Sequence, residues 1–132
     1  MRLWHTKLLP FLPKGQLLSQ WRELNSIFAK EDKHILINYI YNYPKDDLYT
    51  YTEKVIEEMT NRGYKIRTRD KMDRYFTDLD KVKVVTPFKK HHNDEYLEIC
   101  YYNLKEKFIR GQKDYDAALF QKLEAFIKNK LI

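Results

Sequence analysis

The chain has 132 residues, 43% of them hydrophobic, and its 25 lysines and arginines outnumber its 19 aspartates and glutamates to give a net charge of +6. These values argue against a disordered chain and fit a single domain over residues 1–132. A lone cysteine, Cys100, excludes an internal disulfide, and neither a signal peptide nor a membrane-length apolar run is evident, so we expect a cytoplasmic protein.

The first thirteen residues, MRLWHTKLLPFLP, form a dense apolar lead that Pro10 and Pro13 break before a long helix can form. We expect this segment to lie against the core and to hold the amino terminus in a fixed place. The first helix is predicted from Lys14 to Ala29, because apolar side chains recur along one stripe at 100° per residue. The residues of this stripe are Leu17, Leu18, Trp21, Leu24 and Phe28.

Residues 35–43, ILINYIYNY, are ambiguous from their pattern. The three tyrosines alternate as they would in a strand, but a helix is also possible, and Pro44 ends the segment in either case. A second helix is expected to begin at a cap formed by Asp46 or Asp47 and to stop at Gly63.

The remainder of the chain also favours helices. A basic connector, RGYKIRTRDK, follows the second helix, and Asn93 or Asp94 is expected to begin a third helix that ends near Gly111. A last helix is predicted over residues 116–132. The sequence therefore predicts an all-α fold, a single compact domain of three to five helices with irregular connections.

The positive net charge favours an anionic partner, with nucleic acid ranked before an acidic membrane surface. Eleven tyrosines and seven phenylalanines could stack on bases, although most aromatic side chains in a small domain belong to the core. Glycine-rich phosphate loops, H-E-x-x-H and paired cysteine motifs are all missing. His91 and His92 with Cys100 do not have the spacing of metal ligands, because adjacent side chains point apart on a helix or a strand, so we expect no metal site.

The polar face of the first predicted helix has an unusual composition. With Trp21 taken as 0°, Glu23 lies at about 200°, on the side away from the apolar stripe. Its polar neighbours are Gln16, Ser19, Gln20, Arg22 and Ser26 rather than lysine–glutamate pairs. Such a face is either an ordinary solvated surface or the wall of a groove that accepts a polar ligand closely.

Several motifs resemble one known family. QLLSQWRELNSIF with Lys33-His34, RGYKI at residues 62–66 and NLKEK at residues 103–107 are similar to stretches of the phage-type pyrimidine-dimer DNA glycosylase/abasic-site lyase family, often called the endonuclease V family. The opening MRLWH and the helix-one run look most like its bacterial branch. The aromatic carboxyl-terminal segment of the family is not reproduced by FQKLEAFIKNKLI.

The resemblance implies a helical monomer that binds damaged duplex DNA, kinks it and flips a base out of the stack, without a metal or cofactor. The terminal α-amine would attack C1′ to form an imine, and Glu23 would be the acid/base. Arg2 holds the position of the family's small nucleophilic residue, so the available amine is that of Met1. An α-amine has an ordinary pKa of about 7.7–8.0 against about 10.4 for lysine, which makes it the better nucleophile near neutral pH.

The resemblance also implies a set of DNA contacts. Arg22 is carried over directly, whereas Gln16 and Ser26 replace a histidine and an arginine of the family. The looser candidates are Lys33, His34, Arg62, Lys65, Arg67 and Arg69, with a second cluster at Lys89, Lys90, His91 and His92. Two alternatives remain open, a non-catalytic nucleic-acid-binding module of the same fold and a protein-interaction domain whose charge is incidental.

Overall fold

A computed structural model describes residues 1–131, and over this range the chain forms α-helices and 3-10 helices and no strand. The predicted all-α fold is confirmed. The elements are η1 (Thr6–Phe11), α1 (Lys14–Lys30), η2 (Asn38–Asn42), α2 (Lys45–Asn61), α3 (Asp70–Tyr75), α4 (Asp94–Ile109) and α5 (Ala117–Leu131). The predicted last position of the final helix, Ile132, lies outside the described residues. None of the described helices is long and apolar enough to cross a membrane.

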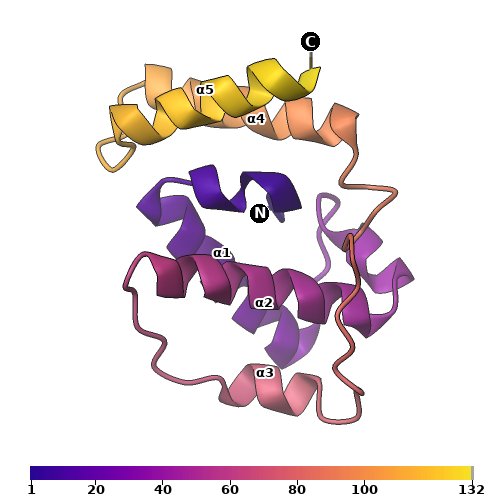
Figure 1. Ribbon diagram of the computed structural model, residues 1–132. Helices are drawn as coiled ribbons and strands as arrows, with labels where there is room; N and C mark the ends of the chain where they lie inside the picture. Colours follow the sequence, from indigo (N-terminus) through magenta and orange to yellow (C-terminus); the bar gives the residue numbers. More distant parts are fainter. Residues whose placement is uncertain (132) are drawn as a thin grey trace.

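The helices lie in layers around the amino-terminal segment. α4 and α5 run together on one side, α1 and α2 form the next layer, and α3 lies beyond them against α1 (Figure 1). η1 lies between the layers, in contact with α2, α4 and α5. Leu3, Leu8 and Leu12 are fully buried. The prediction that residues 1–13 lie against the core is therefore confirmed.

α1 and α2 begin directly after prolines. Pro13 precedes α1 and Pro44 precedes α2, so neither Asp46 nor Asp47 is the cap that the sequence suggested. Both aspartates instead lie in the first turn of α2, where a negative charge favours the helix dipole. The carboxylate of Asp47 also accepts a hydrogen bond of 2.8 Å from the backbone N–H of Phe88.

The ambiguous segment over residues 35–43 forms no strand. It makes a turn and then the short helix η2, with Ile37 and Ile40 buried. Strand pairing would need a neighbouring extended segment, and the described residues offer none. The alternating tyrosines pack on the periphery of the core: Tyr39 and Tyr43 both meet Phe88 edge to face.

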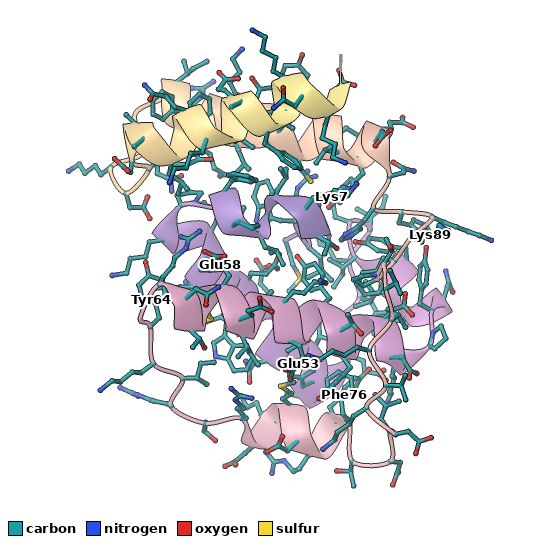
Figure 2. All side chains as sticks on the ribbon, viewed as in Figure 1. Lys7, Glu53, Glu58, Tyr64, Phe76 and Lys89 are labelled. Carbon is teal, nitrogen blue, oxygen red and sulfur yellow. The ribbon has the colours of Figure 1, made fainter. Side chains whose placement is uncertain are left out.

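α3 is an addition to the predicted elements, because its residues were expected to be connector. Met72 is buried beneath this one-and-a-half-turn helix, and Phe76 at its end lies between α2 and α3 (Figure 2). Phe76 meets the rings of Phe28 and Tyr49 edge to face at 5.3 Å each. α3 is thus fixed by apolar contacts with distant parts of the chain.

The carboxyl-terminal pair of helices follows the prediction closely. Asn93 caps α4 by accepting a 2.9 Å hydrogen bond from the backbone N–H of Tyr96. α4 gives way to the connector before Gly111, whose φ of 84° favours glycine. Across the pair, the rings of Phe108 and Phe120 stack in parallel with centroids 4.1 Å apart.

Candidate active site and nucleic-acid interface

Glu23 lies on α1 as a half-buried carboxylate. Burial raises its pKa above the ordinary value, and the positive charges of the terminal amine and of Arg22 oppose that rise. Partial desolvation favours the protonated form of this carboxyl and the two nearby cations favour its ionised form, so the two influences are opposed, and desolvation is the larger.

The amino terminus lies within electrostatic range of this carboxylate. Of the two positive charges that lower the pKa of Glu23, the terminal amine has a larger effect than Arg22. Among residues 1–131, the ion pairs within 4.0 Å join Arg62 to Glu58 and Arg110 to Glu106, so the Met1 amine and Glu23 are near each other without being in contact. Met1 as a whole is 40% exposed.

The side chain of Arg2 lies near Trp4 and near Tyr96 of α4. Its guanidinium carbon lies 5.7 Å from the centre of the Trp4 ring. Burial raises the pKa of Tyr96 on α4, and the charge of Arg2 acts against that rise. The main chain of Arg2 points the other way, because its carbonyl oxygen accepts a 3.2 Å hydrogen bond from Gln20 Nε2.

Gln20 departs from the predicted polar face. The helical wheel set it beside Glu23 on the solvent side, but its side chain is fully buried. The amide nitrogen of Gln20 donates to Glu23 Oε2 at 3.0 Å as well as to the Arg2 carbonyl. The amino-terminal segment covers this part of α1, so polar neighbours of Glu23 include a buried partner.

A basic groove lies along the exposed side of α1; Arg22, the neighbour of Glu23, lines it, whereas Glu23 and Met1 do not. We call it the α1 groove; its volume is about 580 Å³. Four cationic side chains and no carboxylate line it, with Trp21 supplying an aromatic wall. The lining residues are Trp21, Arg22, Asn25, Ser26, Ala29, Lys30, Arg67, Thr68 and Lys71. Such a groove suits the phosphates of a nucleic-acid strand.

The α1 groove brings together some of the predicted contacts. Arg22 and Arg67, 45 positions apart in sequence, both line it, whereas Lys65 is exposed on the connector outside the lining. Arg69 precedes the first turn of α3 as its N-cap. Lys30 and Lys71 were not among the predicted contacts. Lys30 lies eight positions after Arg22 on the same helix and could have been found by its spacing. Lys71 is the last residue of the basic connector RGYKIRTRDK, whose charge could have marked it.

Other predicted contacts are engaged elsewhere in the protein. Arg62 donates to Glu58 Oε2 at 2.7 Å and to the Pro10 carbonyl oxygen at 3.1 Å. Gln16 Oε1 accepts a hydrogen bond from Gln112 Nε2 at 2.7 Å. Ser26 does line the α1 groove, but its hydroxyl donates a hydrogen bond to the carboxylate of Asp32.

Lys33 and His34 lie beyond the end of α1. The ammonium of Lys33 sits 3.7 Å from the centre of the Tyr41 ring. His34 is exposed, and its Nδ1 accepts the backbone N–H of Leu36 at 3.1 Å, which shapes the turn there. Neither residue lines the α1 groove.

The second basic cluster divides in two. Lys89 and Lys90 are exposed on the connector between α3 and α4, where Figure 2 shows Lys89 at the side of the molecule. His91 is exposed and its Nδ1 lies 2.7 Å from the Tyr43 hydroxyl. His92 is buried, with Nδ1 accepting from the Thr6 N–H and Nε2 at 2.7 Å from the Tyr39 hydroxyl. His92 is thus part of the core.

A small helical domain with a carboxylate and its own terminal amine beside a basic groove has the features of a DNA glycosylase. A model of the pyrimidine dimer DNA glycosylase family matches residues 1–72, more than half of the chain, and the chain belongs to that family. No curated protein and no solved structure matches the chain. Glu23, the amino terminus and the whole lining of the α1 groove fall within the matched residues.

Proposed function

We propose that this member of the family excises damaged bases from duplex DNA and then cleaves the strand at the abasic site. The family description indicates pyrimidine dimers as the lesion. In this proposal the amine of Met1 is the nucleophile and Glu23 is the acid/base. The observation that carries it is the position of Glu23 on α1, directly after Arg22, which lines the α1 groove, and within range of the charge of the terminal amine.

The proposed reaction begins when the neutral amine gives its lone pair to C1′ of the damaged nucleotide. The N-glycosidic bond breaks and the base leaves with a proton, which produces an imine between the protein and the sugar. Loss of a C2′ proton then breaks the C3′–O bond and releases the phosphate, and water hydrolyses the imine to restore the amine. Protons move but no net electrons are lost, so the reaction calls for no metal or cofactor.

Glu23 serves this sequence in both of its protonation states. As a carboxylate it stabilises the positive charge that develops on the sugar, and as an acid it delivers the proton that opens the ring. The rise in the pKa of Glu23 on burial increases its protonated fraction and so favours the acid role.

The α1 groove supplies affinity for the DNA strand. Its cations neutralise phosphates, and each neutralised phosphate releases counterions into solution. Extrusion of a base costs a few kcal/mol, and a lesion that weakens stacking lowers that cost. We propose that the protein acts as a monomer in the cytoplasm on damaged duplex DNA.

The test is reductive trapping with an abasic-site duplex, because borohydride reduces the imine to a stable secondary amine. The wild type is expected to form a covalent adduct, and Glu23→Gln to form it about 10²–10⁴ times more slowly while still binding the duplex. Acetylation of the Met1 amine should abolish the adduct. Glu95→Gln, at an exposed carboxylate in the first turn of α4, is the matched control and should trap at the wild-type rate.

A second function is favoured by two observations. The large residue Arg2 follows Met1, and among residues 1–131 the Met1 amine makes no ion pair with Glu23 within 4.0 Å. This second function is that of a non-catalytic DNA-binding module. That module would bind duplex DNA with an affinity that falls steeply as salt rises. Salt-dependent binding with no trapped adduct at any protein concentration would favour the module over the glycosylase/lyase.

A further inference from the structure

One buried amide joins the start of the chain to Glu23. The Oε1 atom of Gln20 accepts the backbone N–H of Trp4 at 2.8 Å and lies 2.9 Å from the Tyr51 hydroxyl. The Nε2 atom of the same amide donates to the Arg2 carbonyl oxygen at 3.2 Å and to Glu23 Oε2 at 3.0 Å.

The Trp4 N–H, the Arg2 carbonyl and Glu23 fix the orientation of this amide, and the single hydroxyl hydrogen of Tyr51 is shared between Gln20 Oε1 and the Trp4 carbonyl oxygen. A turn of the amide by 180° would set its NH₂ against the Trp4 N–H and its oxygen against the Arg2 carbonyl and the Glu23 carboxylate. Because the side chain is fully buried, water cannot replace a lost partner without opening the core. The amide is therefore held in a single position.

We propose that Gln20 is a positioning residue that sets the distance and direction between the amino-terminal amine and Glu23. It acts through the main chain of Arg2 and through the Glu23 carboxylate, to which it donates a hydrogen bond. Its consequence for catalysis rests on the proposed function, whereas its geometric role does not.

The physical need for such a residue follows from where the proposed nucleophile lies. Chain termini fray unless they are tied down, and each free backbone residue samples many directions. A hydrogen bond to the carbonyl oxygen of residue 2 restrains the peptide unit that follows this residue, so few rotatable bonds remain between that unit and the amine. The Tyr51 hydroxyl adds a second tie, because it also lies 2.6 Å from the Trp4 carbonyl oxygen.

Neither close replacement for glutamine preserves this arrangement. Glutamate would lose both N–H donors and bring a second carboxylate to the place now 3.0 Å from Glu23 Oε2. Methionine fills a similar volume but leaves the Trp4 N–H, the Arg2 carbonyl and Glu23 without their partner.

The first test needs no DNA. The charge of the terminal amine lowers the pKa of Glu23, so acetylating Met1 in the wild type should raise that pKa, as measured by NMR titration of the labelled Glu23 carboxyl carbon. In Gln20→Met the rise on acetylation should fall to half or less. Gln121→Met, at an exposed glutamine of α5, is the matched control and should show the full rise. An undiminished rise in folded Gln20→Met would overturn the inference.

The second test uses Gln20→Glu, which keeps the shape of the buried side chain. Two facing carboxylates share a proton more readily than either alone, so the acid limb of the trapping rate against pH should move upward by about one unit or more. Duplex affinity should stay within about threefold of the wild type, because no groove cation is lost. A pH profile that coincides with the wild-type profile, or a loss of affinity in parallel with trapping, would refute positioning by Gln20.

The two proposals fail in different ways. If the wild type forms no adduct but acetylation shifts the Glu23 titration in a Gln20-dependent manner, the lyase is refuted and the geometric role of Gln20 stands. If the wild type traps and Gln20→Glu traps with an unchanged pH profile, the lyase stands and the Gln20 inference is wrong.

Discussion

The first 72 residues and the remainder of the chain do different work. Glu23, the amino terminus and the α1 groove all belong to the first region, which the family model matches. The second region, residues 73–131, contributes groups that hold the main chain of the first. The Tyr96 hydroxyl donates to the Leu3 carbonyl oxygen at 2.6 Å, and the Tyr115 hydroxyl donates to that of Phe11 at 2.9 Å.

This difference shows that many amino-acid sequences could fulfil the supporting role of the second region. Backbone carbonyl groups near η1 need donors because its short helical turns leave them unpaired. Many side chains on many helix faces could supply such donors and cover Leu8 and Leu9. In contrast, few positions in the sequence could place a carboxylate where it faces one particular amine.

The largest effect on stability is expected when the second region is removed. A fragment of residues 1–72 would expose the side of η1 that α4 and α5 now cover, together with the apolar side chains of its core-facing residues. We expect this fragment to show no cooperative thermal unfolding by circular dichroism, whereas the full chain unfolds in one transition. A cooperative transition in the fragment would mean that the second region is dispensable for the fold.

A point substitution in the second region should lower stability without altering the chemistry. Phe120 is 6% exposed and stacks on Phe108. Phe120→Ala is expected to lower the free energy of unfolding by about 3–5 kcal/mol, as measured by urea denaturation. Gln121→Ala, at the exposed neighbouring position, should cost under about 0.5 kcal/mol. A trapping rate per folded molecule that falls with Phe120→Ala would place the second region in the active site.

The long helices could be predicted from the sequence because their determinants are local. α1 carries an apolar stripe, α2 ends shortly before Gly63, whose φ is 82°, and Asn93 caps α4. For the segment that forms η2 the sequence left strand and helix open, and α3 was not predicted, since each is only about one and a half turns long. Their conformations depend on distant residues, such as the ring of Phe28 that packs against Phe76.

The candidate site was open to prediction only in part. Arg22 and Glu23 were found from the resemblance, and Arg67 from its charge. The burial of Gln20 was missed because a helical wheel describes one helix and contains no information on the segment that covers it. That segment reaches Gln20 through Trp4 and Arg2, contacts made across 16 and 18 positions of sequence.

Two buried histidines allow the contact between the regions to be tested by pH. His5 belongs to the first region and His92 to the second, and their ring centroids lie 5.2 Å apart. Burial lowers the pKa of His5 to about 4 and that of His92 to about 3, from an ordinary value of 6.5.

The unfolded chain therefore binds more protons than the folded one below pH 6.5, and stability should fall as the pH drops from 6.5 toward 4. Between pH 7 and pH 5.5 we expect a loss of about 2 kcal/mol in urea denaturation. His92→Gln should reduce this pH dependence by about half, while His34→Gln, at an exposed histidine, should leave it intact. A stability that stays level across this range would show that the histidines are not held neutral.

The smallest expected effect separates two arginines of the first region that the sequence grouped together. Arg67 lines the α1 groove, whereas the guanidinium of Arg62 is held by Glu58 and the Pro10 carbonyl. Arg67→Ala is expected to weaken duplex binding by about 1 kcal/mol and to reduce the slope of log affinity against log salt by about one. Arg62→Ala should leave that slope unchanged, because a guanidinium already neutralised by a carboxylate releases few counterions when DNA binds. If Arg62→Ala reduced the slope and Arg67→Ala did not, the DNA would follow the side of α2 and η1 instead of the α1 groove, and Glu23 would lose its place beside the bound strand.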